Sequence, residues 1–199
     1  RKTFDKEQSV NLTVNNLFGD TIQIPTNVKF AAGDSVKTIT INTKNLILMK
    51  SYHVSITVDQ EQTKPYITQS LYPRIELNIL KEDYAPYAEG TFTSEFFEAN
   101  WDQTLEFSPS TKIYRFKNLY ADNYNYSFKV SATGAITQVP NSAIKTGYVD
   151  TKYGMVSLLA NSTSNFNSAN STYTFNAKFT VSAGSFGVFA EKYLITKKL

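Results

Sequence analysis

The chain has 199 residues, of which 41% are hydrophobic, 14% aromatic and 19% charged, and its formal net charge at pH 7 is +3. This length fits one large domain or two of about 100 residues, and the plentiful apolar residues exclude a disordered chain. The lysines and arginines are spread along the chain rather than clustered, which argues against binding nucleic acid. The lack of cysteine excludes disulfides, thiol nucleophiles and cysteine-ligated metals.

The polar residues are those of strands and turns rather than of helices. The chain contains 23 Thr, 18 Ser and 17 Asn. Thr, Tyr, Phe and Val suit a half-buried pleated surface, whereas Asn and Ser suit turns. The strong helix formers Ala, Leu, Glu and Lys do not dominate. The composition therefore predicts an all-β fold.

Apolar and polar residues alternate along much of the first 80 residues, as in strands with one buried face. The strands predicted from this alternation are 9–14, 20–25, 35–42, 52–58 and 74–79. Turns are expected at Gly19-Asp20, Gly33-Asp34 and residues 60–65. Short strands at this spacing are typical of a sandwich, so we predict an Ig-like β-sandwich over residues 1–82.

The alternation breaks at residues 80–90, which bring charge, Pro86 and Gly90, and we place a domain junction there. A second, aromatic-rich antiparallel domain, either a β-sandwich or barrel-like, is predicted over residues 87–199. Its predicted strands are 91–97, 104–107, 112–120, 124–132, 154–160, 173–181 and 186–196. The polar run 161–172 is predicted to be a loop at a hairpin tip.

Acidic residues flank Trp101, the only tryptophan, at spacings of three, four and four. They are Glu95, Glu98, Asp102 and Glu106. On a short helix or turn around 94–103 they would form one acidic face, but a glycosidase needs two carboxylates held across a cleft. Nothing in the spacing makes two of them converge, so we favour a solvated face and predict no catalytic residue. A glycan-active hydrolase using carboxylates near Trp101 remains the alternative.

Three aromatic residues are candidates for binding a ligand. Trp101 is either a platform for a sugar ring or, as is more common for one Trp in a β domain, a packing residue. Tyr148 and Tyr153 belong to a glycine-containing stretch that we predict to be a loop, where their rings would be exposed.

The single histidine, His53, alternates with Val54 and Ile56 and should point away from the core. A catalytic triad needs a histidine beside both a serine and a carboxylate, and a histidine-cluster metal site needs several. No calcium-loop motif is present either. We therefore predict no metal and no cofactor.

Three segments in order resemble exported lipoproteins of Bacteroidetes. The first segment is "VKFAAGDSVKTITINTKNLILMKSYHVSITVDQEQTKPY". The second is "YAEGTFTSEFFEANWDQTLE", followed by "YRFKNLY". The third is "TGYVDTKYGMV", followed by "YTFNAKFTVSAGSFGVFAEKYLI". The resemblance covers nearly the whole chain. It implies an Ig-like domain followed by a C-terminal β domain of undescribed function.

The resemblance also implies an extracytoplasmic location, on the outer membrane surface or in the periplasm. Such proteins are anchored through a lipidated N-terminal cysteine, which this chain lacks, so the anchor is expected in the full-length protein only. We expect a non-catalytic module that binds a polysaccharide or another surface protein. A structural or adhesive surface subunit is a further alternative.

Overall fold

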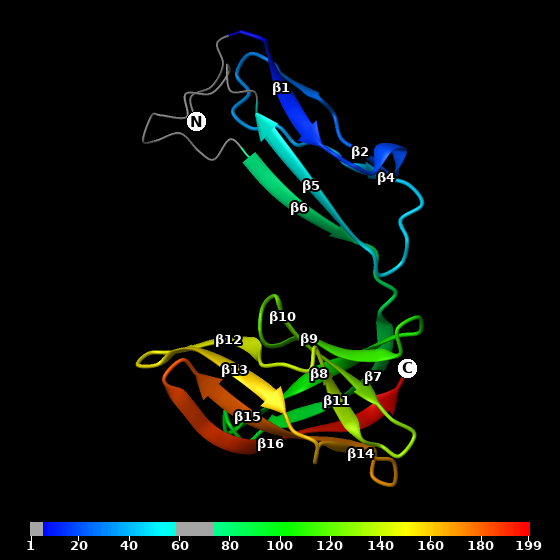
Figure 1. Ribbon diagram of the computed structural model, residues 1–199, viewed down its shortest axis with the longest axis vertical. Coiled ribbons are helices and arrows are strands. Elements are labelled where there is room, and N and C mark those ends of the chain that lie inside the picture. The colour runs from blue at the N-terminus through cyan, green and yellow to red at the C-terminus, as the bar shows by residue number, and fades with distance from the viewer. Residues whose placement is uncertain (1–5, 59–73) are drawn as a thin grey trace. The chain divides into compact units, whose positions relative to one another are not determined.

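The computed structural model describes residues 6–58 and 74–199, and nearly every element in these ranges is a strand (Figure 1). The chain divides into two compact units, Arg1–Glu82 and Asp83–Leu199. The predicted all-β fold is confirmed: the sheets are antiparallel, sandwich-like in the first unit and barrel-like in the second. The turn predicted at 60–65 lies outside the described residues.

The first unit has two antiparallel sheets. Its elements are β1 (Gln8–Asn15), the 3₁₀ turn η1 (Gly19–Thr21), β2 (Ile22–Gln23), β3 (Asn27–Phe30), β4 (Asn42–Thr43), β5 (Ser51–Val58) and β6 (Arg74–Leu80). One sheet has the order β3-β1-β5-β6, and the other pairs β2 with β4. Because side chains alternate along a strand, one face of each sheet supplies the core. Its buried members are Leu12, Ile22, Tyr52, Val54 and Ile56.

The strand predicted at 35–42 is much shorter in the structure, where only Asn42–Thr43 forms a ladder. A turn precedes this segment, and in it the Asp34 carboxylate accepts a hydrogen bond from the Ala31 amide at 2.9 Å. Two hydrogen bonds lower the pKa of Asp34: the bond from the Ala31 amide has the larger effect, and the bond from Lys37 comes second. Ile39 and Ile41 still pack against the core without strand pairing, so the apolar alternation reflects burial alone.

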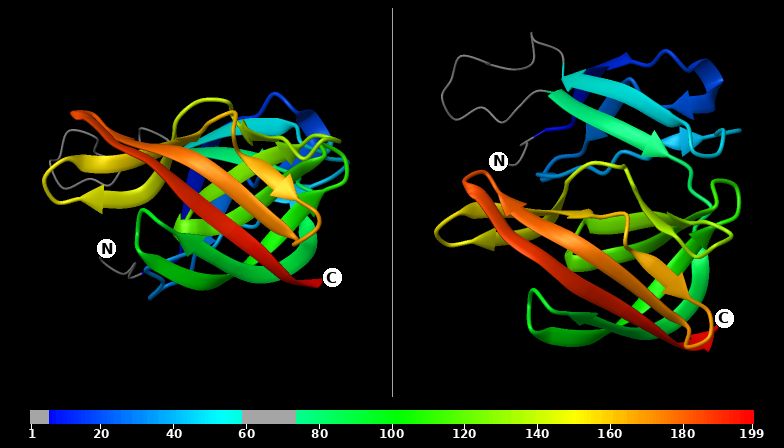
Figure 2. Two further views of the ribbon diagram at one scale, coloured as in Figure 1. Left: turned by 90° about the horizontal axis from the view of Figure 1, so that it is seen from below. Right: turned by 60° about the horizontal axis from the view of Figure 1, so that its bottom comes forward.

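The second unit is built from one long, curled antiparallel sheet (Figure 2). Its strands are β7 (Ala85–Ser94), β8 (Ala99–Ser108), β9 (Ile113–Ala121), β10 (Tyr124–Val130), β11 (Ile136–Val139), β12 (Ile144–Asp150), β13 (Gly154–Ala160), β14 (Asn165–Asn167), β15 (Thr172–Val181) and β16 (Gly184–Lys198). The order is β11-β10-β9-β8-β7-β16-β15-β13-β12, and β14 pairs with β15.

The curled sheet closes on itself between β11 and β14. The Ile136 amide donates to the Ser164 carbonyl at 3.0 Å, and the Phe166 amide donates to the Gly134 carbonyl at 2.7 Å. The interior is filled mainly by aromatic rings, and Phe92, Phe116 and Phe128 are each at most 1% exposed. Closure wraps the sheet around these rings, while β12 stays an edge strand that pairs with β13 alone among the described residues.

Three strands of this unit were not predicted from the sequence: β11, β12 and β14. β14 lies within the run 161–172 that we predicted to be a loop. β12 contains Tyr148, so the predicted loop position of Tyr148 is wrong, whereas Tyr153 lies in the turn after β12. Gly147 adopts φ +85° and interrupts the pairing of β12 with β13, which explains why no regular alternation marked this strand.

The residues around Trp101 form a β-hairpin rather than a helix. β7 and β8 pair from Ala85 with Phe107 to Ser94 with Ala99, and a turn at 95–98 joins them. Glu98 adopts φ +51° in this turn. A helical acidic face is therefore excluded, and the strong β formers of 91–97 determine the local structure.

The close approach of β7 and β16 at Gly90 predicts a clear mutational effect. A Cβ on Gly90 would lie 2.1 Å from the Leu194 carbonyl oxygen and 2.8 Å from the Tyr193 ring. Gly90→Ala should lower the free energy of unfolding by about 1–3 kcal/mol, because a paired backbone must move. Urea unfolding followed by Trp101 fluorescence would measure the second unit. Glu89→Ala, at an exposed neighbour, is the control and should stay within about 1 kcal/mol of the wild type; equal losses would contradict the prediction.

Candidate functional site

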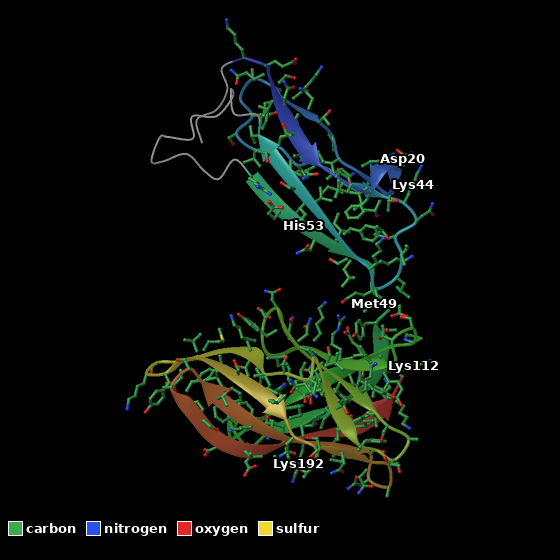
Figure 3. The ribbon with its side chains drawn as sticks, in the orientation of Figure 1. Asp20, Lys44, Met49, His53, Lys112 and Lys192 are labelled. Atoms are coloured by element: carbon green, nitrogen blue, oxygen red, sulfur yellow. The ribbon has the colours of Figure 1, made fainter. Side chains whose placement is uncertain are left out.

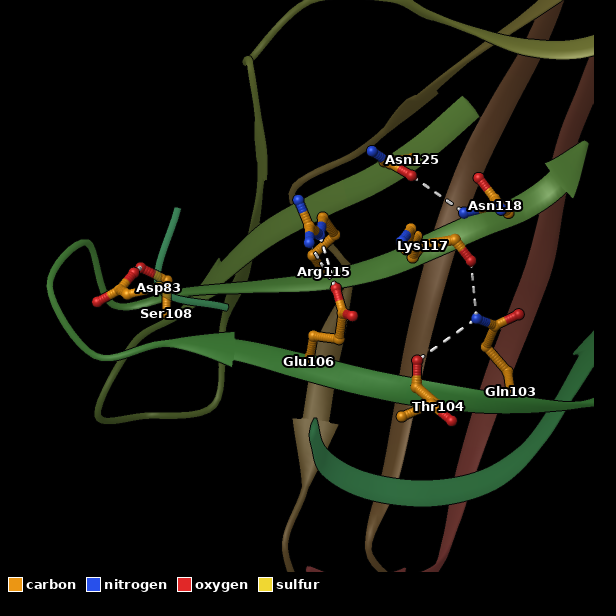
Figure 4. Close-up of polar contacts among 9 residues, drawn as sticks. All are labelled: Asp83, Gln103, Thr104, Glu106, Ser108, Arg115, Lys117, Asn118 and Asn125. Atoms are coloured by element: carbon orange, nitrogen blue, oxygen red, sulfur yellow. Dashed lines mark hydrogen bonds and ion pairs between the residues drawn. The ribbon is translucent and has the colours of Figure 1, made fainter. Parts of the chain in front are cut away.

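The candidate site lies where β8 and β9 separate. These strands pair only from Leu105 with Phe116 to Ser108 with Ile113, although β8 begins at Ala99 and β9 continues to Ala121. Asn118, at φ +53°, bends β9 away. The Gln103 side chain spans the separation, where its Nε2 donates to the Lys117 carbonyl at 3.0 Å (Figure 4). The local break in pairing therefore opens the sheet at one defined place.

A pocket of about 530 Å³ occupies this opening, and we call it the β8–β9 pocket. It is lined by aromatic and polar residues together: Phe97, Trp101, Asp102, Gln103, Asn118, Leu119, Tyr120, Ala121 and Asp122. A second hollow of about 350 Å³ shares Asp102 and Gln103 with it and continues toward β7 and β16. The two hollows therefore adjoin at Asp102 and Gln103, and we call them together the groove.

The Tyr120 ring contacts two other rings of the pocket. The Tyr120 ring centroid lies 6.0 Å from that of Trp101 and 5.3 Å from that of Phe97, and Trp101 also packs on the buried Phe92 ring at 5.1 Å. Trp101 is half-buried, and its Nε1 is buried with no hydrogen-bond partner among the described residues. The packing and ligand-platform interpretations of Trp101 are thus compatible, because the residue packs on the core and lines the pocket.

The acidic residues predicted around Trp101 do not converge. Glu95 accepts a hydrogen bond from the Ala190 amide, and Glu98 is exposed in the hairpin turn. Glu106 pairs with the buried Arg115, whose Nη2 lies 2.7 Å from its Oε2 (Figure 4). Asp102 alone of the four lines the pocket, where Asp122 joins it.

A buried carboxylate that the sequence did not reveal lies behind the pocket. Glu191 of β16 is 1% exposed, and its Oε2 accepts a hydrogen bond from the Tyr120 hydroxyl at 3.0 Å. Its Oε1 accepts from the Phe96 amide at 3.2 Å. Glu191 therefore holds both a ring of the pocket and the β7–β8 turn.

Burial raises the pKa of Glu191, while hydrogen bonds from Ser94, Phe96 and Tyr120 oppose the rise. Burial, reinforced by the Glu191 charge, also raises the pKa of Tyr120 and of Tyr126, so both hydroxyls stay protonated as donors. The Tyr126 hydroxyl is buried without a partner in the described part of the chain.

The other two sequence candidates, Tyr148 and Tyr153, are 41% and 39% exposed, in agreement with the predicted exposure. Tyr148 is adjacent to the pocket, since its ring centroid lies 5.1 Å from that of Phe97. Tyr153 packs against Phe186 at 6.1 Å. The sequence did not single out Tyr120, Asp122 or Glu191. The tyrosine-rich run containing Tyr120 was the one available signal.

His53 lies on β5 of the first unit and is exposed, as its alternation predicted (Figure 3). Its Nε2 lies 2.9 Å from Glu76 Oε2, and its Nδ1 lies 3.0 Å from Asn78 Oδ1. No group of three or more histidine, aspartate or glutamate side chains among the described residues is arranged to hold a metal ion. Within residues 6–58 and 74–199, no helix is long and apolar enough to cross a membrane.

Comparison of the chain with known protein families, with curated proteins and with solved structures returned no match. The function must therefore be argued from the site.

The raised pKa of Glu191 predicts a pH-dependent stability. Its folded-state pKa exceeds its ordinary value of 4.5, so its stabilising contribution is complete below pH 4.5 and is lost as the pH rises through the folded-state pKa. Glu191→Gln should remove this loss, so its unfolding free energy relative to the wild type should increase as the pH rises toward neutral. Urea unfolding across this pH range would measure the difference. Glu98→Gln, in the exposed turn, is the control, and its unfolding free energy should vary with pH as that of the wild type does. If the unfolding free energy of Glu191→Gln ran parallel to that of the wild type across the pH range, the prediction would be wrong.

Proposed function

We propose that this chain is a non-catalytic module of an exported lipoprotein, at the cell surface or in the periplasm, and that its second unit binds a glycan. The observation that carries the proposal is the β8–β9 pocket, where the rings of Trp101 and Tyr120 lie beside Asp102, Asn118 and other polar side chains. The location and anchoring rest on the sequence resemblance alone.

The chemistry of the pocket suits a sugar. A sugar ring has apolar C–H faces that pack on flat aromatic rings, and hydroxyl groups around its edge that need donors and acceptors. Carboxylates accept two or more hydrogen bonds, and side-chain amides both donate and accept. Binding sites of this kind combine aromatic walls with a few convergent polar groups.

The pocket is also preorganised for binding. Trp101 and Tyr120 lie on strands, Trp101 packs on Phe92, and Tyr120 is held by Glu191. Side chains already fixed by packing lose less conformational entropy when a ligand binds. A ligand therefore binds more favourably to these fixed aromatic rings than it would to rings on a mobile loop.

The hydrolase alternative is favoured by one observation, the presence of Asp102 and Asp122 in the same pocket. Hydrolysis would need one of these carboxyl groups as an acid and the other as a base or nucleophile. Both are exposed, whereas the buried carboxylate, Glu191, is already satisfied by protein donors. We therefore keep the non-catalytic proposal.

The adhesive alternative is supported by the exposed apolar side chains of β12 and β16.

Trp101→Ala should weaken glycan binding by at least about tenfold, the usual loss when a central aromatic residue of a binding site is removed. A glycan array identifies the polysaccharide, and retardation gels then compare the variants. Trp101→Phe keeps an aromatic face and should retain most of the affinity. Lys112→Ala, in the β8–β9 turn, is the surface control. Binding that survives Trp101→Ala would place the ligand elsewhere, and no binding across the array would refute the proposed function.

The non-catalytic assignment predicts no steady release of reducing sugar from the bound polysaccharide. A sustained release that disappears in Asp102→Asn or Asp122→Asn would establish the hydrolase instead. Glu95→Gln and Glu98→Gln serve as controls, because neither residue is among those lining the pocket.

A further inference from the structure

Three exposed aromatic residues of the second unit, Tyr148, Tyr153 and Phe186, lie on two neighbouring hairpins, and we call them the aromatic arc. They are 41%, 39% and 36% exposed. Tyr148 and Tyr153 belong to the β12–β13 hairpin, and Phe186 belongs to β16 just after the β15–β16 turn. Figure 2 shows both turns at the same end of the unit as the β7–β8 turn, opposite the C-terminus. Exposed large rings gathered at one place mark an interaction surface.

The aromatic arc is continuous with the β8–β9 pocket. Phe97, which lines the pocket, contacts Tyr148 at 5.1 Å between ring centroids. Its neighbour Phe96 contacts Phe186 at 5.4 Å, and Phe186 contacts Tyr153 at 6.1 Å. Tyr153 and Phe186 also line a shallow hollow of about 250 Å³. A ligand seated on Trp101 and longer than the pocket can therefore continue over further aromatic rings.

The charges around the groove select among glycans. Asp102 and Asp122 line the pocket, and Glu89 lines the adjoining hollow together with Asp102. The carboxylates of Asp102 and Asp122 repel sugars that carry carboxylate or sulfate groups, whereas the Glu89 carboxylate forms an ion pair with Lys197 at 3.4 Å. At the arc both signs of charge are present: Lys152 Nζ lies 4.9 Å from the Tyr153 ring centroid, and the Asp150 carboxylate accepts a hydrogen bond from the Tyr153 amide at 2.8 Å. The groove thus suits sugars without negative charge.

We propose that the aromatic arc provides outer subsites for the same ligand, so that the second unit binds an extended, uncharged polysaccharide chain rather than a single sugar or a chain end. The inference rests on the proposed glycan binding at Trp101. It adds a chain length and a charge class to that function, and it assigns Tyr148 and Phe186 to subsites outside the pocket.

Oligosaccharides of the array-positive polysaccharide, from disaccharide to octasaccharide, test the outer subsites by calorimetric titration of the intact chain. Wild-type affinity should increase with length by about tenfold or more, since each further aromatic ring that the sugar chain contacts strengthens binding. Tyr148→Ala and Phe186→Ala should bind the shortest ligands normally and lose the gain for the longest. Trp101→Ala should lose affinity at every length. Leu194→Ala, also exposed and on β16, should match the wild type.

Several outcomes would overturn the inference and leave the proposed function intact. These are a wild-type affinity that does not depend on length, or a loss in Tyr148→Ala that is equal at all lengths. Self-association of the wild type that Tyr148→Ala abolishes, with glycan affinity unchanged, would instead make the arc an interface between copies. Loss of all glycan binding in the wild type would refute the proposed function itself.

The charge class is tested with the same polysaccharide before and after carboxymethylation. The modified polymer should bind several-fold more weakly at low salt. Asp102→Asn combined with Asp122→Asn should restore much of that loss, because it removes the repelling charges. Equal or tighter binding of the carboxymethylated polymer by the wild type would overturn the assignment to uncharged glycans.

Discussion

Closure of the second unit's sheet between β11 and β14 is the constraint on which the rest of that unit depends. Once the sheet is closed, its inner side chains face one another, and the interior is filled by rings such as Phe92, Phe116 and Phe128. A closed sheet accommodates irregularity only by bending individual strands. The bend of β9 at Asn118 is such an irregularity, and it separates β9 from β8 at the β8–β9 pocket. The pocket is thus a product of the architecture and not of a long loop.

Glu191 links the interior to the pocket. A buried carboxylate is costly unless several donors compensate it, and here the Tyr120 hydroxyl and the Phe96 amide do so. The same two bonds fix a ring of the pocket and the turn that carries Phe97. Stability and binding geometry therefore depend on one side chain, which has no contact with the proposed ligand. Such a residue contributes to function through position alone.

The sequence predicts this fold well where alternation is regular and poorly where the backbone departs from it. β5 and β15 have uninterrupted period-two patterns and were predicted, whereas β12 is interrupted by Gly147 and was missed. Trp101 was found because a single tryptophan beside acids is conspicuous. Asp122 and Glu191 were not, because each reaches the site through a long-range contact that local spacing does not encode. Trp101 and Tyr120 lie close together because β9 bends at Asn118, and no pattern in the sequence predicted that bend.

The alternation of side chains along β8 separates the residues that a ligand would contact from the residues that fill the interior. Leu105 points into the packed interior, while Asp102 lies exposed on the same strand. Asp122 is likewise exposed at the rim of the pocket, whereas Asn118 is constrained by its positive φ and by the hydrogen bond that its Oδ1 accepts from the Asn123 amide at 2.9 Å. Changes at these rim positions alter the hydrogen bonds offered to a ligand and leave the buried rings untouched, so they cost little stability. Substitutions at Asp102 and Asp122 are therefore expected to change ligand preference while the packed interior keeps the scaffold unchanged.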